Sequence, residues 1–168
     1  MTLREILNII FLFVLYLALQ VLIVRNLVLF DVAFCFIYIG SILLLPYELS
    51  LTFTLLIAFS VGIVVDMFYN TLGMHAAATV LMAYIRPVVV RLQAAQRGFE
   101  SRIIFSIHEM GTRNFLYYVF LLALIHHFAL FFIEANNILL LLPTLAKIGA
   151  STVFTTVAIM LVQYFTRN

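Results

Sequence analysis

The sequence predicts an all-α, polytopic membrane protein built as a six-helix transmembrane bundle. Hydrophobic residues make up 66% of the 168 residues, charged residues make up 10%, and the mean hydropathy is +1.22. Soluble domains contain only about 45–50% apolar residues. Six spans of about 20 residues would use about 120 positions. The short loops that remain predict a single integral membrane domain over residues 1–168.

The apolar stretches place the spans at about 6–24, 30–45, 49–66, 73–90, 115–133 and 142–165. The first stretch is too long for a signal-peptide core and has no small-residue cleavage site, so we expect it to remain attached. The second stretch is short for a crossing and is closed by Pro46, which disfavours helical geometry in the preceding residue. We therefore expect it to tilt, to borrow residues from the preceding loop, or to lie partly inside the bundle.

The segment 91–113 is the one long polar connection, and it predicts an amphipathic helix on the cytoplasmic membrane surface. Its apolar residues recur at spacings of three and four. Basic side chains flank this apolar face and would lie near the lipid headgroups. These basic residues are Arg91, Arg97, Arg102 and Arg113.

The arginines also predict the orientation. With a cytoplasmic N-terminus, Arg25 is the single arginine in an outer loop, and the other arginines outside the spans lie inside. Both termini are then cytoplasmic. The net charge of +2 is too small and too scattered to indicate nucleic-acid binding. The single cysteine, Cys35, allows no intramolecular disulfide.

A short motif around the third and fourth spans carries the sharpest functional signal. Ala58, Gly62 and Asp66 follow one another at intervals of four and share one helix face. The next helix begins near Gly73 and His75, so we expect Asp66 and His75 to meet across the hairpin. Small residues let helices approach closely in lipid. We therefore predict a groove for a partner helix, lined by Ala58, Gly62, Gly73 and Ala77.

Asp66 itself has three interpretations: a structural hydrogen bond, a solvated helix end, or proton or ion transport. A metal site of imidazoles and carboxylates at the outer face is a further possibility, from Asp66, His75, His126, His127 and Glu134. The adjacent histidines point about 100° apart and lie roughly two turns from Glu134, which favours structural roles and no metal. The sequence lacks the common phosphate-binding and hydrolase motifs, so we expect neither an enzyme nor a cofactor.

Residues 60–86 combine a glycine-containing span that ends in Asp66, a short polar turn, and Leu72-Gly73-Met74-His75-Ala76 at the start of the next helix. This pattern resembles the MreD family of bacterial rod-shape-determining membrane proteins. The matching positions are Gly62, Asp66, Gly73 and His75. Chain length, six spans and the basic loop after the fourth span are also similar to that family.

The resemblance implies a noncatalytic inner-membrane scaffold of the cell-elongation machinery. Such a protein binds the transmembrane helix of an MreC-like single-span coiled-coil protein. Through that partner it meets MreB filaments, the RodA glycan polymerase and its transpeptidase. The implied fold is similar to that of the substrate-binding subunits of energy-coupling-factor transporters. The alternative is therefore such a transport subunit, with an outward pocket near Asp66, His75 and Glu134.

Overall fold

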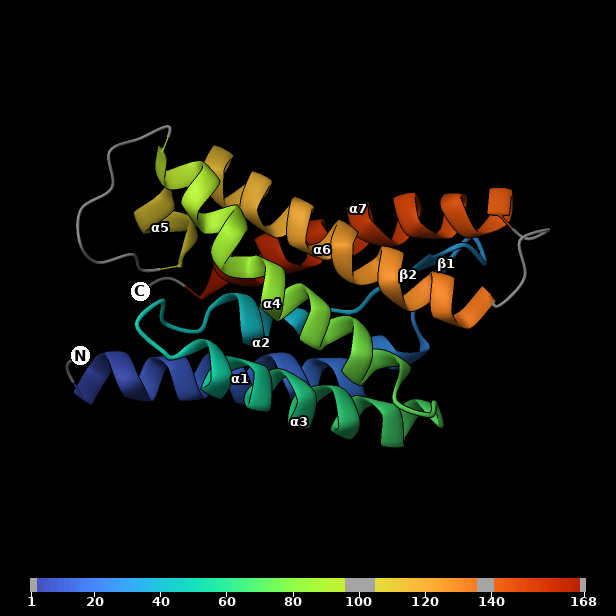
Figure 1. The fold of residues 1–168 in the computed structure, drawn as a ribbon, viewed down its shortest axis with the longest axis horizontal. Helices are drawn as coiled ribbons and strands as arrows, with labels where there is room; N and C mark the ends of the chain where they lie inside the picture. The colour runs from blue at the N-terminus through green and yellow to red at the C-terminus, as the bar shows by residue number, and fades with distance from the viewer. Residues whose placement is uncertain (1–2, 96–104, 136–140, 167–168) are drawn as a thin grey trace.

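The computed structural model of the chain describes residues 3–95, 105–135 and 141–166, and most of them are helical. Figure 1 shows long helices that run side by side, with a small β-hairpin at one end. The elements in order are α1 (Leu3–Leu22), a 3-10 turn (Val24–Asn26), β1 (Val28–Leu29), β2 (Ala33–Phe34), α2 (Ile39–Leu43), α3 (Leu51–Tyr69), α4 (Met74–Ala95), α5 (Ile107–Met110), α6 (Thr112–Ala135) and α7 (Leu141–Phe165).

Four of these helices are long and apolar enough to cross a membrane, namely α3, α4, α6 and α7. They correspond to the predicted third to sixth spans, which are therefore confirmed as helices of spanning length and composition. The first predicted span is also helical, but its apolar part, Ile6–Leu22, is shorter than these four. The fold is thus that of a helical, multi-pass membrane protein.

The long helices pack side by side, and different parts of the chain lie at the two ends of the bundle. Helix α4 packs between α3 and α6, and α7 packs against α6 and β2. Figure 1 places both chain termini at one end of the bundle, which we call the terminal end. The β1–β2 hairpin and the α3–α4 turn lie at the opposite end, which we call the turn end.

The predicted second span, 30–45, is wrong as a helix. Strands β1 and β2 pair in antiparallel register, Val28 with Phe34 and Leu29 with Ala33. The chain then runs extended into the bundle and forms only the five-residue helix α2. Nearly all of residues 33–45 are buried, so the expectation that this stretch lies partly inside the bundle is confirmed.

Extended backbone in an apolar interior needs hydrogen-bond partners, because no water is there to satisfy its amides and carbonyls. Helix α7 supplies two of these partners from residues one turn apart. Ser151 Oγ accepts the backbone N–H of Phe34 at 2.9 Å, and Thr155 Oγ1 accepts that of Phe36 at 3.0 Å. The hydroxyl groups of Ser151 and Thr155 thus take the place of a neighbouring strand.

Helix α1 supplies two further bonds through one buried side chain, Gln20. Its Oε1 accepts the backbone N–H of Tyr38 at 3.2 Å, and its Nε2 donates to the carbonyl of Cys35 at 3.2 Å. Tyr16, one turn earlier on α1, lies directly on Gly40, where a Cβ would come within 2.6 Å of the Tyr16 ring. Glycine at position 40 therefore lets α1 pack against α2.

The predicted surface helix over 91–113 is wrong at its two ends, and its middle, 96–104, lies outside the described residues. Helix α4 continues past Arg91, and α6 already includes Arg113. Arg97 and Arg102 lie outside the described residues. Phe105 is buried because its ring stacks on Tyr118 at a centroid distance of 5.0 Å. The end of this connection therefore packs into the bundle rather than along a lipid surface.

Candidate functional site

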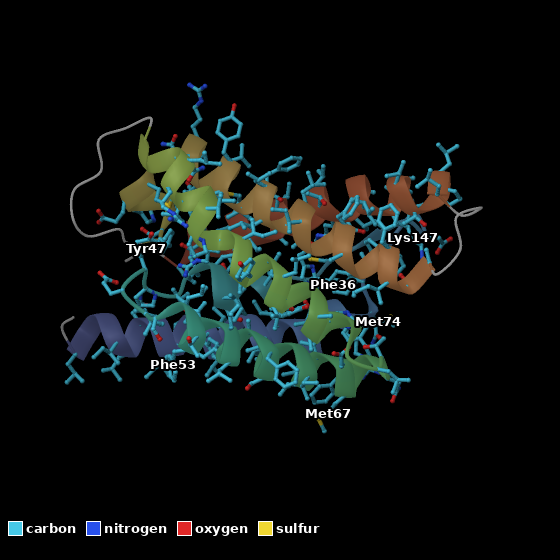
Figure 2. All side chains as sticks on the ribbon, viewed as in Figure 1. Phe36, Tyr47, Phe53, Met67, Met74 and Lys147 are labelled. Carbon is cyan, nitrogen blue, oxygen red and sulfur yellow. The ribbon has the colours of Figure 1, made fainter. Side chains whose placement is uncertain are left out.

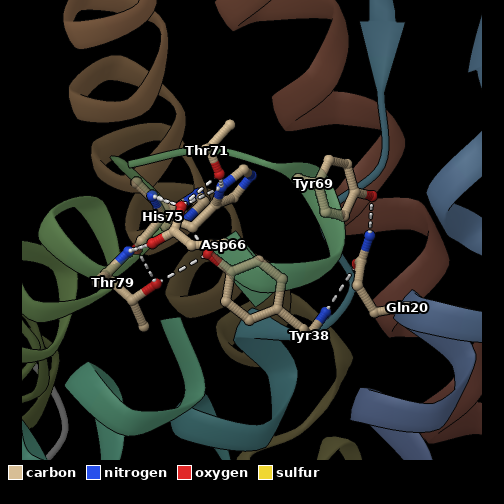
Figure 3. A network of polar contacts seen from close by, with 9 residues as sticks. Gln20, Tyr38, Asp66, Tyr69, Thr71, His75 and Thr79 are labelled. Carbon is tan, nitrogen blue, oxygen red and sulfur yellow. Dashed lines mark hydrogen bonds and ion pairs between the residues drawn. The ribbon is translucent and has the colours of Figure 1, made fainter. Parts of the chain in front are cut away.

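The site begins with the carboxylate of Asp66, which binds the first turn of helix α4. Asp66 Oδ1 accepts the backbone N–H of His75 at 3.0 Å, and Oδ2 accepts that of Ala76 at 3.0 Å. These amides belong to the first helical turn, which has no partners within its own helix. A carboxylate also interacts favourably with the positive end of the helix dipole. Asp66 of α3 therefore caps α4 (Figure 3).

The side chains around this carboxylate complete the cap. The Nδ1 of His75 lies 3.0 Å from Asp66 Oδ1, so the predicted meeting of the two residues across the hairpin is confirmed. The hydroxyl of Thr71 donates to the same oxygen and lies 3.0 Å from His75 Nδ1. Asp66 and His75 are 4% and 3% exposed, so this arrangement is shielded from solvent.

The turn between the helices explains why the carboxylate reaches the next helix. Asn70 adopts a left-handed conformation with φ of 54°, and the N–H of Thr71 bonds the carbonyl of Asp66 at 3.1 Å. This arrangement is typical of a helix C-terminus. Gly73 follows with φ of 80°, which favours glycine because it has no Cβ. The chain reverses within four residues and returns α4 against α3.

Close packing of the two helices holds this geometry. A Cβ on Gly62 would lie 2.3 Å from the Cα of Ala76, so the two backbones touch at this position. Ala58, one turn earlier, is fully buried. The face that the sequence assigns to a partner helix is therefore occupied by α4 of the same chain. Of the predicted groove residues, Ala77 is exposed and Gly73 is half-buried.

A chain of hydrogen bonds continues from the cap into the bundle. Thr79 Oγ1 donates to the carbonyl of His75 at 2.6 Å. Its oxygen can then only accept from the hydroxyl of Tyr38, 2.8 Å away, and Tyr38 in turn accepts from His126 Nε2 at 2.7 Å. We therefore assign the proton of His126 to Nε2. This chain connects α4, the extended segment and α6.

His127 forms a second and separate contact with the extended segment. Its Nδ1 donates to the carbonyl of Ala123 at 2.6 Å, which leaves Nε2 to accept from the hydroxyl of Thr155 at 3.2 Å. Thr155 also accepts the backbone N–H of Phe36. Both adjacent histidines are fully buried. Each one positions the extended segment through a hydroxyl group.

Gln20 joins this network to helix α3 and was not recognised from the sequence. Its Nε2 donates to the hydroxyl of Tyr69 at 2.6 Å, in addition to the bonds that it makes with the extended segment. Figure 3 shows Gln20, Tyr38 and Asp66 within one polar region. A lone glutamine inside a predicted span was the available signal, because buried polar groups in lipid need partners.

Arg86 was also missed, although an arginine inside a predicted span is a strong signal. It is 4% exposed, and its Nε donates to the hydroxyl of Tyr118 at 2.7 Å. Its Nη2 donates to the carbonyls of Leu43, at 3.3 Å, and Leu45. The guanidinium lies 4.3 Å from the ring centroid of Phe105. Arg86 therefore binds the C-terminal end of α2 to α4 and α6.

The five residues considered for a metal site do not come together as one. Glu134 is half exposed and lies 3.7 Å from Lys147 Nζ. Asp66 and the Nδ1 of His75 bind each other within the hairpin, and the two histidines of α6 bind Tyr38 and Thr155. Within residues 3–95, 105–135 and 141–166, no group of three or more His, Cys, Asp or Glu residues suits a metal ion.

Fold and site together define a helical multi-pass membrane protein whose polar interior links its helices to one another. Comparison with family models, with curated proteins and with solved structures finds no match.

Proposed function

We propose that the chain is a noncatalytic scaffold of the bacterial cytoplasmic membrane that belongs to the cell-elongation machinery. It binds the transmembrane helix of an MreC-like single-span protein, and through it MreB filaments, the RodA glycan polymerase and its transpeptidase. One observation carries the proposal. The motif residues that resemble the MreD family, Gly62, Asp66, Gly73 and His75, build the α3–α4 hairpin. In this proposal the hairpin shapes a surface for a partner.

In this proposal the chain crosses the membrane six times. The substrate-binding subunits of energy-coupling-factor transporters, whose fold resembles that of the MreD family, would have the same number of crossings. The segment from Ala33 to Leu45 provides the second crossing, partly extended and partly helical. Side chains of α1 and α7 accept the backbone N–H groups of Phe34, Phe36 and Tyr38, which helps to make a non-helical crossing physically possible. Both termini lie at the terminal end, which we assign to the cytoplasm.

The partner helix would dock on the exposed stripe of α4, which consists of Ala77, Leu81, Tyr84 and Val88. Their spacing of four, three and four residues is typical of a seam between two packed helices. Ala77 is the exposed small residue of the predicted groove, and a small residue lets a second helix approach closely. Ala58 and Gly62 have no such role here, because α4 already covers them.

The test is purification of the complex from native membranes in mild detergent, followed by mass spectrometry of the proteins recovered. Ala77→Leu would obstruct the α4 stripe and is compared with Ala146→Leu, the same change at an exposed position of α7. We expect Ala77→Leu to lower recovery of a single-span coiled-coil protein at least several-fold, and Ala146→Leu to leave it unchanged. Both variants must elute as folded protein.

Two results would overturn the proposal. Equal recovery of the partner with Ala77→Leu and wild type would exclude the α4 stripe as its binding surface. Recovery of a membrane coupling subunit with paired ATPases, in place of elongation proteins, would instead favour the transport alternative. The described residues add no observation in favour of that alternative, because Asp66 and His75 are buried and bind each other.

A further inference from the structure

The two tight turns at the turn end each carry one large apolar side chain at the tip. Phe30 is 93% exposed at the tip of the β1–β2 hairpin, and Leu72 is 100% exposed in the α3–α4 turn. Turn tips normally carry polar residues, because they face water. Two such tips at the same end of one protein therefore need a physical explanation (Figure 1).

Both side chains are presented by well-defined backbone rather than by loose loops. Phe30 and Asp31 have φ of 54° and 57°, a left-handed conformation that a bulky residue such as Phe rarely adopts. The N–H of Val32 closes this turn on the carbonyl of Leu29 at 3.1 Å. Leu72 lies between Thr71, which the Asp66 cap holds, and Gly73, at φ of 80°.

The length of α3 indicates the depth at which the Leu72 tip lies. The helix has 19 residues and is therefore about 28 Å long, against a hydrocarbon core of about 30 Å. A helix of that length places the turn after it at the boundary between the acyl chains and the headgroups. Leu72 then meets lipid rather than bulk water, even though none of the described residues covers it.

Further exposed apolar side chains lie near each tip, beside the exposed polar residues Asp31 and Asn70. Leu27, Val28 and Leu29 are exposed beside Phe30, and Met67 is 74% exposed on the last turn of α3. Figure 2 shows the Met67 side chain pointing away from the bundle. An apolar rim of this kind is unfavourable in water but favourable against acyl chains.

We infer that Phe30 and Leu72 are lipid anchors, which insert at the acyl–headgroup boundary of one leaflet and hold the turn end of the bundle level with that surface. The occupant of the rim is lipid, and no second protein is needed to cover it. The inference is independent of the proposed scaffold function.

The chain contains no Trp, so single-Trp variants report their own surroundings without background. We would reconstitute Phe30→Trp and Leu72→Trp in phosphatidylcholine vesicles that contain lipids brominated at a shallow or a deep acyl position. Phe59→Trp is the matched control, because Phe59 is exposed halfway along α3. We expect blue-shifted emission from both tips with strongest quenching by the shallow bromines, and strongest quenching of Phe59→Trp by the deep bromines.

Other outcomes would overturn the inference. Red-shifted emission that iodide quenches and brominated lipids do not would place the tips in water. Blue-shifted emission insensitive to brominated lipids would mean that a second copy of the chain covers the rim. Quenching of the tips with the same depth profile as Phe59→Trp would place them too deep for the boundary. Met67→Trp probes the same surface outside the turn if Leu72→Trp lowers the yield of folded protein.

Discussion

Asp66 and His75 lie nine residues apart and meet across a tight turn, with Asp66 Oδ1 3.0 Å from both the backbone nitrogen and Nδ1 of His75. The contact lets the end of one helix cap the beginning of the next. A carboxylate inside a membrane-spanning segment costs free energy. Here the carboxylate of Asp66 stabilises the hairpin by capping α4. The predictions below follow from this cap and from the contacts that surround it.

The first prediction concerns the cap itself. Asp66→Ala leaves the amides of His75 and Ala76 without acceptors, and we expect the free energy of unfolding to fall by about 2–3 kcal/mol. Asp66→Asn keeps one acceptor oxygen and should lose less. Unfolding in mixed micelles by circular dichroism provides the measurement, with the half-exposed Glu134→Ala as the control. A change within about 0.5 kcal/mol for Asp66→Ala would contradict the capping role.

The second prediction uses two glycines in different surroundings. Gly62→Ala would force a Cβ to 2.3 Å from the Cα of Ala76, so α3 and α4 must separate. We expect a loss of about 2–3 kcal/mol or a failure to fold, since overpacking at a backbone contact has no flexible side chain to move. Gly149→Ala in α7 meets nothing within 4 Å and should be neutral or stabilising by up to about 1 kcal/mol. Equal thermal stability of the two variants would disprove the close contact.

The third prediction concerns Gln20 and the single cysteine. Cys35 is 3% exposed, so a maleimide should label it slowly in the folded protein. Gln20→Leu removes the partners of the Tyr38 amide and the Cys35 carbonyl, so we expect the extended segment to open and Cys35 to be labelled many times faster. Ser60→Ala, which is exposed and bonded within its own helix, is the control. Unchanged labelling in Gln20→Leu would show that Gln20 does not hold the segment.

The fourth prediction concerns the buried guanidinium. Arg86→Lys keeps the charge but loses the planar guanidinium that donates to Tyr118 and to the carbonyls of Leu43 and Leu45, and we expect the free energy of unfolding to fall by about 1–3 kcal/mol. Tyr118→Phe should be non-additive with it, with a coupling energy of about 0.5–3 kcal/mol. Arg91→Lys, on the exposed face of α4, should change little. Strict additivity of the two core substitutions would indicate that their hydrogen bond contributes no stability.

The sequence by itself determined the long helices and the meeting of Asp66 with His75 across the hairpin. Apolar runs of spanning length predict α3, α4, α6 and α7, and the interval of four between Gly62 and Asp66 puts both on the face that α4 meets. These features could be predicted because they depend on residues close together in the chain. The small-residue face was assigned to a partner, however, because the sequence does not show which helix covers it.

Only the tertiary structure decided the course of residues 30–45 and of the connection near Phe105. The apolar stretch could form a helix by itself, but Gln20, Ser151 and Thr155 satisfy its extended backbone from positions far away in the sequence. Phe105 is likewise drawn into the bundle by Tyr118 and the Arg86 guanidinium. Hydrogen-bond partners and ring contacts that come from distant helices override the local pattern, and only the folded arrangement brings them together.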